Sequence, residues 1–233
     1  MKDFTEGNIA RQVIDFTLPV MLGNVLMTVY GIINMIWVGR LLGHKAVAAV
    51  SASLPILMLM PSFLIGLGMA ATVLIAQAYG RRDTELLKKI LSNSFISSML
   101  FCLLISLGAV LFRRELLDLV HAPQEIYGMA LSYMTIMLAT MVFQFFINWM
   151  AGMLRGLGDA STVLRILFLL TVFNIVFVPL FIHGFGPLPA MGIDGAAWGT
   201  AAAAVAASII GYIYLLQYNP YVDMKNWDYS LDW

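Results

Sequence analysis

Six long apolar runs dominate this sequence, and each is long enough to cross a membrane as a helix. A crossing takes about 20 apolar residues, because the hydrocarbon core of a bilayer is roughly 30 Å thick. A helix also satisfies its backbone hydrogen bonds internally, as lipid requires. Only 11% of the residues are charged, against about 25% in a soluble domain. The sequence predicts an all-α membrane protein, a bundle of six transmembrane helices, with runs at 13–38, 47–78, 90–112, 127–154, 163–185 and 193–216.

The basic residues between these runs predict how the chain lies in the membrane. The first run extends roughly 25 residues without a small-residue cleavage site, so we expect a retained span and not a signal peptide. An even number of spans puts both termini on one side. That side holds Lys2, Arg11, Arg81, Arg82, Lys88, Lys89, Arg155, Arg165 and Lys225, whereas the other holds Arg40, Lys45, Arg113 and Arg114. Because cytoplasmic loops are rich in basic residues, we predict a multi-pass protein of the cell inner (plasma) membrane with both termini in the cytoplasm.

Side chains that could carry out a chemical reaction are scarce. No carboxylate falls in the middle of a run, although an intramembrane carboxylate is the usual mark of an ion or proton pathway. The sequence has no nucleophile and base arrangement, no phosphate-cradling glycine loop and no cluster of metal ligands. Its single cysteine, Cys102, allows no internal disulfide. We therefore expect no enzyme, no cofactor, no bound metal and no nucleic-acid partner, with membrane lipids as the surroundings.

Several separated motifs carry a resemblance to a known family. In chain order they read FTEGNIARQVIDFTLPVMLGN, INMIWVGRLLG, GLGMAATVLIAQAYGRRD, MLRGLGDAST, NIVFVPLFI and GIDGAAWGTA. This series resembles the N-terminal six-helix lobe of the multidrug and toxic compound extrusion (MATE) transporters. The resemblance implies a secondary antiporter that exports organic cations or drugs in exchange for sodium or protons.

The family builds a transporter from two six-helix lobes that face each other across a central cleft. The resemblance here covers one lobe, residues 1–216, which implies a second six-helix lobe, either a missing C-terminal half or a partner chain. Residues 217–233 are rich in Tyr and Trp, as suits an interfacial tail or inter-lobe linker at the headgroup layer. A solvated, disordered tail is the alternative.

Two positions depart from the family pattern. One branch of the family carries an aspartate where this chain has Asn34, and an Asn-x-x-x-Asp-Pro pattern where this chain has Asn174, Val178 and Pro179. Both carboxylates within the lobe are therefore missing. Because neither Asn34 nor Val178 can titrate, the residues of this lobe do not support proton coupling within it.

The first and fifth runs each supply a candidate binding residue. Tyr30 and Asn34 lie four residues apart and share a helix face, and we expect Asn34 to line a polar chamber where its carbonyl oxygen binds sodium or a substrate cation. The alternative is a helix-to-helix contact of about 0.6 kcal/mol. Asn174 precedes Pro179, which we expect to open the helix and free a backbone carbonyl for a cation. The alternative is an amide that caps the kinked backbone.

The fourth run supplies a second pair. Gln144 and Asn148 lie on one helix face, near Met141 and Trp149 in sequence. Aromatic faces attract cations and methionine side chains repack readily, so the pair predicts a pocket for a small, flat organic cation. Ordinary helix packing or lipid contact is the alternative. Arg155 opens the turn RGLGD, and we interpret it as an anchor of the helix end without a role in transport.

Two other functions stay open at this stage. A flippase for lipid-linked precursors, from the same superfamily, needs a cationic chamber, and the runs contain no interior Lys or Arg. A truncated lobe without transport activity is the third reading, which the missing carboxylates favour.

Overall fold

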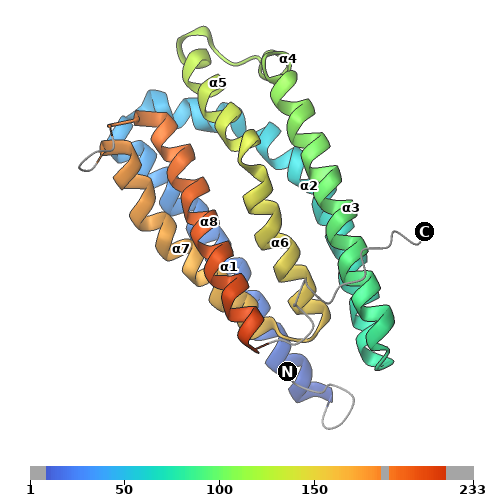
Figure 1. Ribbon diagram of the computed structural model, residues 1–233. Coiled ribbons are helices and arrows are strands. Elements are labelled where there is room, and N and C mark those ends of the chain that lie inside the picture. The colour runs from blue at the N-terminus through green and yellow to red at the C-terminus, as the bar shows by residue number, and fades with distance from the viewer. Residues whose placement is uncertain (1–8, 185–188, 219–233) are drawn as a thin grey trace.

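The computed structural model describes residues 9–184 and 189–218, and within them helix is the only regular secondary structure. Eight helices follow one another along these residues (Figure 1). They are α1 (Ile9–Leu42), α2 (His44–Gly80), α3 (Thr84–Leu111), α4 (Arg113–Leu119), α5 (Gln124–Ala139), α6 (Met141–Gly156), α7 (Ala160–His183) and α8 (Gly192–Tyr218). The predicted tail, 217–233, lies outside the described residues except for its first two residues, which end α8.

Five of these helices are each long and apolar enough to cross a membrane, namely α1, α2, α3, α7 and α8. The sixth span is the pair α5 and α6, which are bent by 47° at the break between them. The prediction of a six-span helical bundle is therefore confirmed, although the fourth span is not one straight helix.

Thr140 stands at this bend. Its hydroxyl and its backbone N–H both donate to the carbonyl of Ile136, at 2.7 Å and 2.9 Å. The short helix α4 was also not predicted, and it is held by Leu117, which is fully buried.

The helices form two groups that lie side by side (Figure 1). Helices α1, α7 and α8 pack together, while α2 packs with α3, α5 and α6. One end of the bundle holds the start of α1, the α2–α3 turn, the α6–α7 turn and the end of α8, and we call it the N-terminal end. Asp83 and Asp159 cap the helices that begin there, accepting from the backbone N–H groups of Leu86 and Thr162 at 3.0 Å.

The closest helix packing lies between α7 and α8. A Cβ atom added at Gly199 would stand 2.7 Å from the Cα of Val178 and 2.9 Å from the carbonyl oxygen of Phe177. Ala196, Ala203 and other alanines of α8 are fully buried. Small residues allow such approach in membranes, where packing and not the hydrophobic effect holds helices together. This packing brings the next residue, Thr200, against α7.

Candidate functional site

Three polar side chains from three helices meet where α1, α7 and α8 pack together. The Asn34 side-chain amide of α1 donates to the hydroxyl oxygen of Thr200 on α8 at 3.4 Å. Asn174 of α7 donates to the same oxygen at 3.3 Å. The Thr200 hydroxyl in turn donates to the carbonyl of Ala196 at 2.9 Å. We call Asn34, Asn174 and Thr200 the amide cluster.

The amide cluster contains two carbonyl oxygens without a partner. Asn34 Oδ1 and Asn174 Oδ1 are both buried and accept no hydrogen bond from a described residue. A buried acceptor left unpaired costs about 1–3 kcal/mol, so such groups normally hold water or an ion. Side-chain carbonyl oxygens are ligands that hard cations accept. The cluster is thus chemically suited to a small cation.

The cluster has no carboxylate of its own. Val178, one turn beyond Asn174, is fully buried and packs against Val38 and Ala197. Among residues 9–184 and 189–218, no group of three or more His, Cys, Asp or Glu side chains could hold a metal ion. A cation bound here would be held by neutral dipoles alone.

The predicted opening of the helix at Pro179 is not found. Helix α7 is continuous from Ala160 to His183, with the proline inside it. The amide nitrogen of Asn174 bonds to Thr200, so that amide does not cap a kinked backbone. Proline still has no N–H to donate, which leaves the carbonyl of Ile175 without its usual helical donor. A proline fits here because neighbouring helices pack around the span.

A second feature, the central pocket, lies beside the cluster and has a volume of about 320 Å³. Three predicted site residues line it, namely Tyr30, Gln144 and Asn148, whereas Asn34 and Asn174 do not. The remaining lining is mostly apolar and includes Met60, Met69, Met137, Met141, Phe145 and Trp149. The expected combination of amides, methionines and an aromatic ring is therefore present around one cavity.

Tyr30 connects the central pocket with the amide cluster. It lines the pocket together with Gln144, and its side chain lies near Thr200 of the cluster. In the pocket, the Asn148 side-chain nitrogen donates to the backbone carbonyl of Gln144 at 2.9 Å, and its side-chain oxygen stays available to a ligand. The five predicted residues thus form two adjoining sites and not one.

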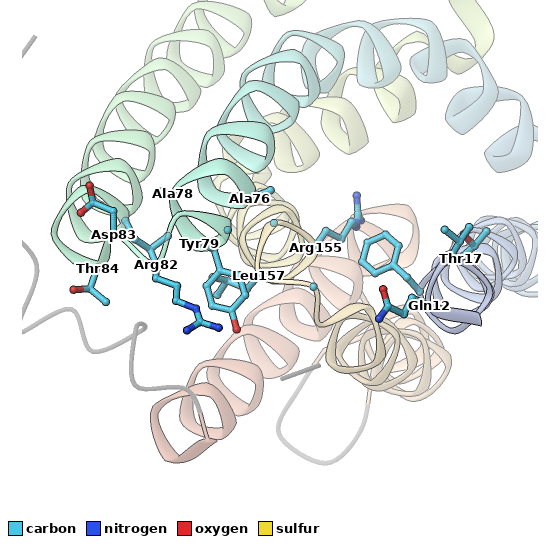
Figure 2. A pocket seen from close by; sticks show the side chains of 16 residues that line it. Gln12, Thr17, Ala76, Ala78, Tyr79, Arg82, Asp83, Thr84, Arg155 and Leu157 are labelled. Atoms are coloured by element: carbon cyan, nitrogen blue, oxygen red, sulfur yellow. The ribbon is translucent and has the colours of Figure 1, made fainter. Parts of the chain in front are cut away.

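A larger cavity of about 760 Å³ opens at the N-terminal end of the bundle (Figure 2). We call it the end cavity. Its wall comes from α1, the end of α2, the start of α3 and the end of α6. Arg155 lines both this cavity and the central pocket, so its side chain stands at the junction of the two.

Sequence reasoning missed two residues of these sites. Thr200 lies in a run of small residues, GTAAAA, that we interpreted as packing only, and its polarity within that run was the available signal. Arg155 was interpreted as an anchor of a helix end. The spacing of residues along one helix does not show that the Arg155 side chain reaches two cavities.

Comparisons with known proteins agree on one family. The MatE family model matches residues 19–180. The probable multidrug resistance protein YpnP of Bacillus subtilis is 35% identical over 218 residues, which are 93% of this chain and 48% of that relative. The multidrug export protein MepA of Staphylococcus aureus is 28% identical, over 95% of this chain and 48% of its own length. The chain spans about half the length of the relatives it matches.

Solved structures give the same result. The crystal structure of MATE in complex with MaD5 matches with a TM-score of 0.85 and 29% identity, and covers 97% of this chain and 50% of that one. The likeness is one of the fold of the whole chain, and it extends over half of the solved structure.

Proposed function

Since the chain belongs to the MatE family, we propose that it forms the N-terminal six-helix lobe of a secondary antiporter. This antiporter exports small organic cations or drugs, and sodium is the coupling ion that binds this lobe. It performs no enzymatic reaction. It lies in the cell inner (plasma) membrane with both termini in the cytoplasm, as the distribution of basic residues favours.

The single observation that carries this proposal is the pair of buried, unpartnered oxygens, Asn34 Oδ1 and Asn174 Oδ1. They lie on two helices that share one hydrogen-bond acceptor, Thr200. A sodium ion between these oxygens would lose part of its hydration shell, and the two amide oxygens would take the place of the lost water molecules. A proton would find no basic group in the amide cluster, because amides and hydroxyls do not titrate near neutral pH. The cluster therefore favours sodium over protons.

Coupling between ion and drug requires that each affects the binding of the other. Tyr30 supports such coupling, because its side chain lies near Thr200 on one side and near Gln144 in the central pocket on the other. A cation that draws the Thr200 oxygen toward itself would change the partners of Tyr30, and through Tyr30 those of Gln144. In this proposal the central pocket contributes one wall of the drug site.

The opposite wall belongs to a second six-helix lobe, supplied by a C-terminal half or by a partner chain. Relatives twice as long as this chain support that requirement. An even number of spans gives a second lobe the same orientation in the membrane, as in transporters built from parallel repeats. Exchange then proceeds by movement of one lobe against the other.

A precursor flippase and a lobe without transport activity stay as alternatives. Arg155 places one guanidinium at the edge of the central pocket, where the sequence indicated no positive charge. One guanidinium at the edge is a weak match for a pyrophosphate-bearing substrate, because the Met and aromatic lining is otherwise neutral. The antiporter proposal fits this lining better.

Thermal unfolding of the purified chain in sodium chloride and in choline chloride, at equal ionic strength, tests the proposed ion site. A ligand that binds only the folded state raises the stability by RT ln(1 + [L]/Kd), so we expect a melting temperature that rises with sodium and not with choline. Identical melting in both salts would contradict sodium binding by this lobe. The Asn34→Ala variant should lose the sodium response and provides the matched control.

A further inference from the structure

The end cavity combines an apolar wall with a guanidinium. Val13 and Phe16 of α1, Leu87 of α3 and Leu157 after α6 supply apolar surface, and Arg82 and Arg155 supply positive charge. Figure 2 shows Arg155 between Thr17 of α1 and Ala76 of α2. The cavity holds about 760 Å³, more than twice the volume of the central pocket. The end cavity is separate from the amide cluster and from the bulk of the central pocket.

The carboxylates near this cavity are already engaged. Asp83 is the one acidic residue in the lining; it accepts from the Leu86 backbone N–H, and its side chain points away from the guanidinium of Arg82 (Figure 2). Glu85 lies 3.7 Å from Lys88, and Asp159 accepts from both the backbone N–H and the hydroxyl of Thr162. The acidic residues of these turns thus cap helices or pair with lysine.

The guanidinium of Arg155 has no hydrogen-bond or ion-pair partner among residues 9–184 and 189–218. Arginine carries five N–H donors in a planar fork that fits a phosphate or carboxylate. Arg155 is also exposed, so its guanidinium can receive an anion from outside the described chain.

The place of the cavity indicates which anion fits. It lies at the N-terminal end of the bundle, where the apolar helices stop and where the headgroups of one leaflet would meet the protein. Basic residues at this level attract anionic lipids. A free phosphate needs no apolar wall, whereas a phospholipid presents a charged head and an apolar chain together.

We propose that the end cavity binds an anionic phospholipid, with the phosphate on Arg155 and the first part of an acyl chain against Val13, Phe16 and Leu87. This site goes beyond the proposed transport function and does not depend on it. The lipid would link α1 to the ends of α2 and α6, and so would stabilise the N-terminal end of the bundle.

Native mass spectrometry of the purified chain in detergent tests this site. The probes are palmitoyl-oleoyl phosphatidylglycerol, palmitoyl-oleoyl phosphatidylcholine with the same acyl chains, glycerol phosphate and inorganic phosphate. We expect phosphatidylglycerol to bind most tightly. Arg155→Gln should weaken it by about tenfold, the effect of one hydrogen bond to a charged group, and Arg155→Lys should weaken it less.

Two further variants separate charge from shape. Arg81→Gln removes the same charge from the same turn but outside the cavity lining, so it should keep the wild-type affinity. Ala76 is exposed and lines the cavity, so Ala76→Trp should fill it and weaken lipid binding without a change of charge. Size-exclusion profiles and melting temperatures confirm that each variant is folded.

Three results would overturn the proposal. Equal losses in Arg155→Gln and Arg81→Gln would mean that only the general surface charge attracts the lipid. Displacement of the lipid by glycerol phosphate or inorganic phosphate at equal concentration would mean a site for a free anion. Unchanged lipid affinity in Arg155→Gln would mean that this guanidinium does not hold the lipid phosphate.

Discussion

At the scale of single residues, the proposed function depends on one hydroxyl oxygen, that of Thr200, which two side-chain amides share. Thr200 accepts from Asn34 and Asn174, which fixes both side chains with their carbonyl oxygens unpaired. Three neutral residues thus create a polar site inside an apolar bundle. Such a site can bind a cation, but none of its three side chains gains or loses a proton near neutral pH.

Substitution at Asn34 tests this neutrality. Sodium binding by the wild-type chain should not change between pH 5 and 8, because no group in the cluster titrates there. In Asn34→Asp the carboxylate form binds sodium and the acid form does not, so sodium binding should rise with pH. Melting in sodium against choline at several pH values provides the measurement. A wild-type response that itself changes with pH would place a titrating group in the site.

Thr200→Val tests the shared acceptor. Valine has nearly the shape of threonine but leaves both amides without an acceptor, at about 1–3 kcal/mol for each buried group left unpaired. We expect a lower melting temperature and no sodium response. Thr171→Val is the matched control, since the buried Thr171 hydroxyl bonds only to Leu167 of its own helix. Equal effects of the two substitutions would show that the amides do not depend on Thr200.

Sequence reasoning identified part of this site. Asn34 and Asn174 stand out because an amide in an apolar run is conspicuous and because a family motif surrounds each. Thr200 lies 166 residues after Asn34 and 26 after Asn174, and no periodicity in one helix relates residues on three. The division into an amide cluster and a central pocket is likewise a property of helix packing.

At the scale of helices, the contact between α7 and α8 determines whether the site forms. In Gly199→Ala the new methyl group would stand 2.7 Å from the Cα of Val178, and backbone atoms cannot give way as a flexible side chain can. Overpacking of this kind costs about 1–3 kcal/mol. The two helices should move apart, which lowers the melting temperature. Because Thr200 is the residue after Gly199, the same movement should also weaken the sodium response.

Gly31→Ala is the control for this substitution. A Cβ at Gly31 meets no atom within 4 Å, so the change should leave or slightly raise the melting temperature, as alanine favours helix. The two variants are compared by melting temperature in sodium chloride. A Gly199→Ala variant as stable as Gly31→Ala would contradict the close packing.

Helix boundaries show where sequence reasoning succeeds and where it stops. The lengths of the apolar runs predicted all six crossings, since membrane thickness imposes them. The bend between α5 and α6 falls at Thr140 inside an uninterrupted apolar run, and α4 depends on the burial of Leu117. Both are tertiary outcomes that leave no mark on hydropathy.

At the scale of the molecule, the turns of the bundle alternate between its two ends (Figure 1). Seven basic residues of the described chain belong to the N-terminal end, where they predict the cytoplasm, namely Arg11, Arg81, Arg82, Lys88, Lys89, Arg155 and Arg165. Single cysteines introduced into a Cys102→Ser background test this. Positions in 113–125 should react with a membrane-impermeant reagent added outside cells, and positions in 80–88 should not. The reverse pattern would invert the orientation.

The distribution of buried surface predicts what the isolated chain can do. Only 6% of the most apolar window of α1 is buried, and 17% of that of α2, against 50% in α8. Helices α1 and α2 therefore leave apolar faces uncovered beside the central pocket that they help to line. A transporter needs a second wall that opens and closes against the first.

The chain alone in proteoliposomes should bind sodium yet show no ethidium export in a sodium or proton gradient. Full-length MepA of Staphylococcus aureus serves as the positive control for the assay. Robust export by the isolated chain would show that it is a complete transporter, working as a pair of identical lobes, and crosslinking between two copies would then be found in the same vesicles.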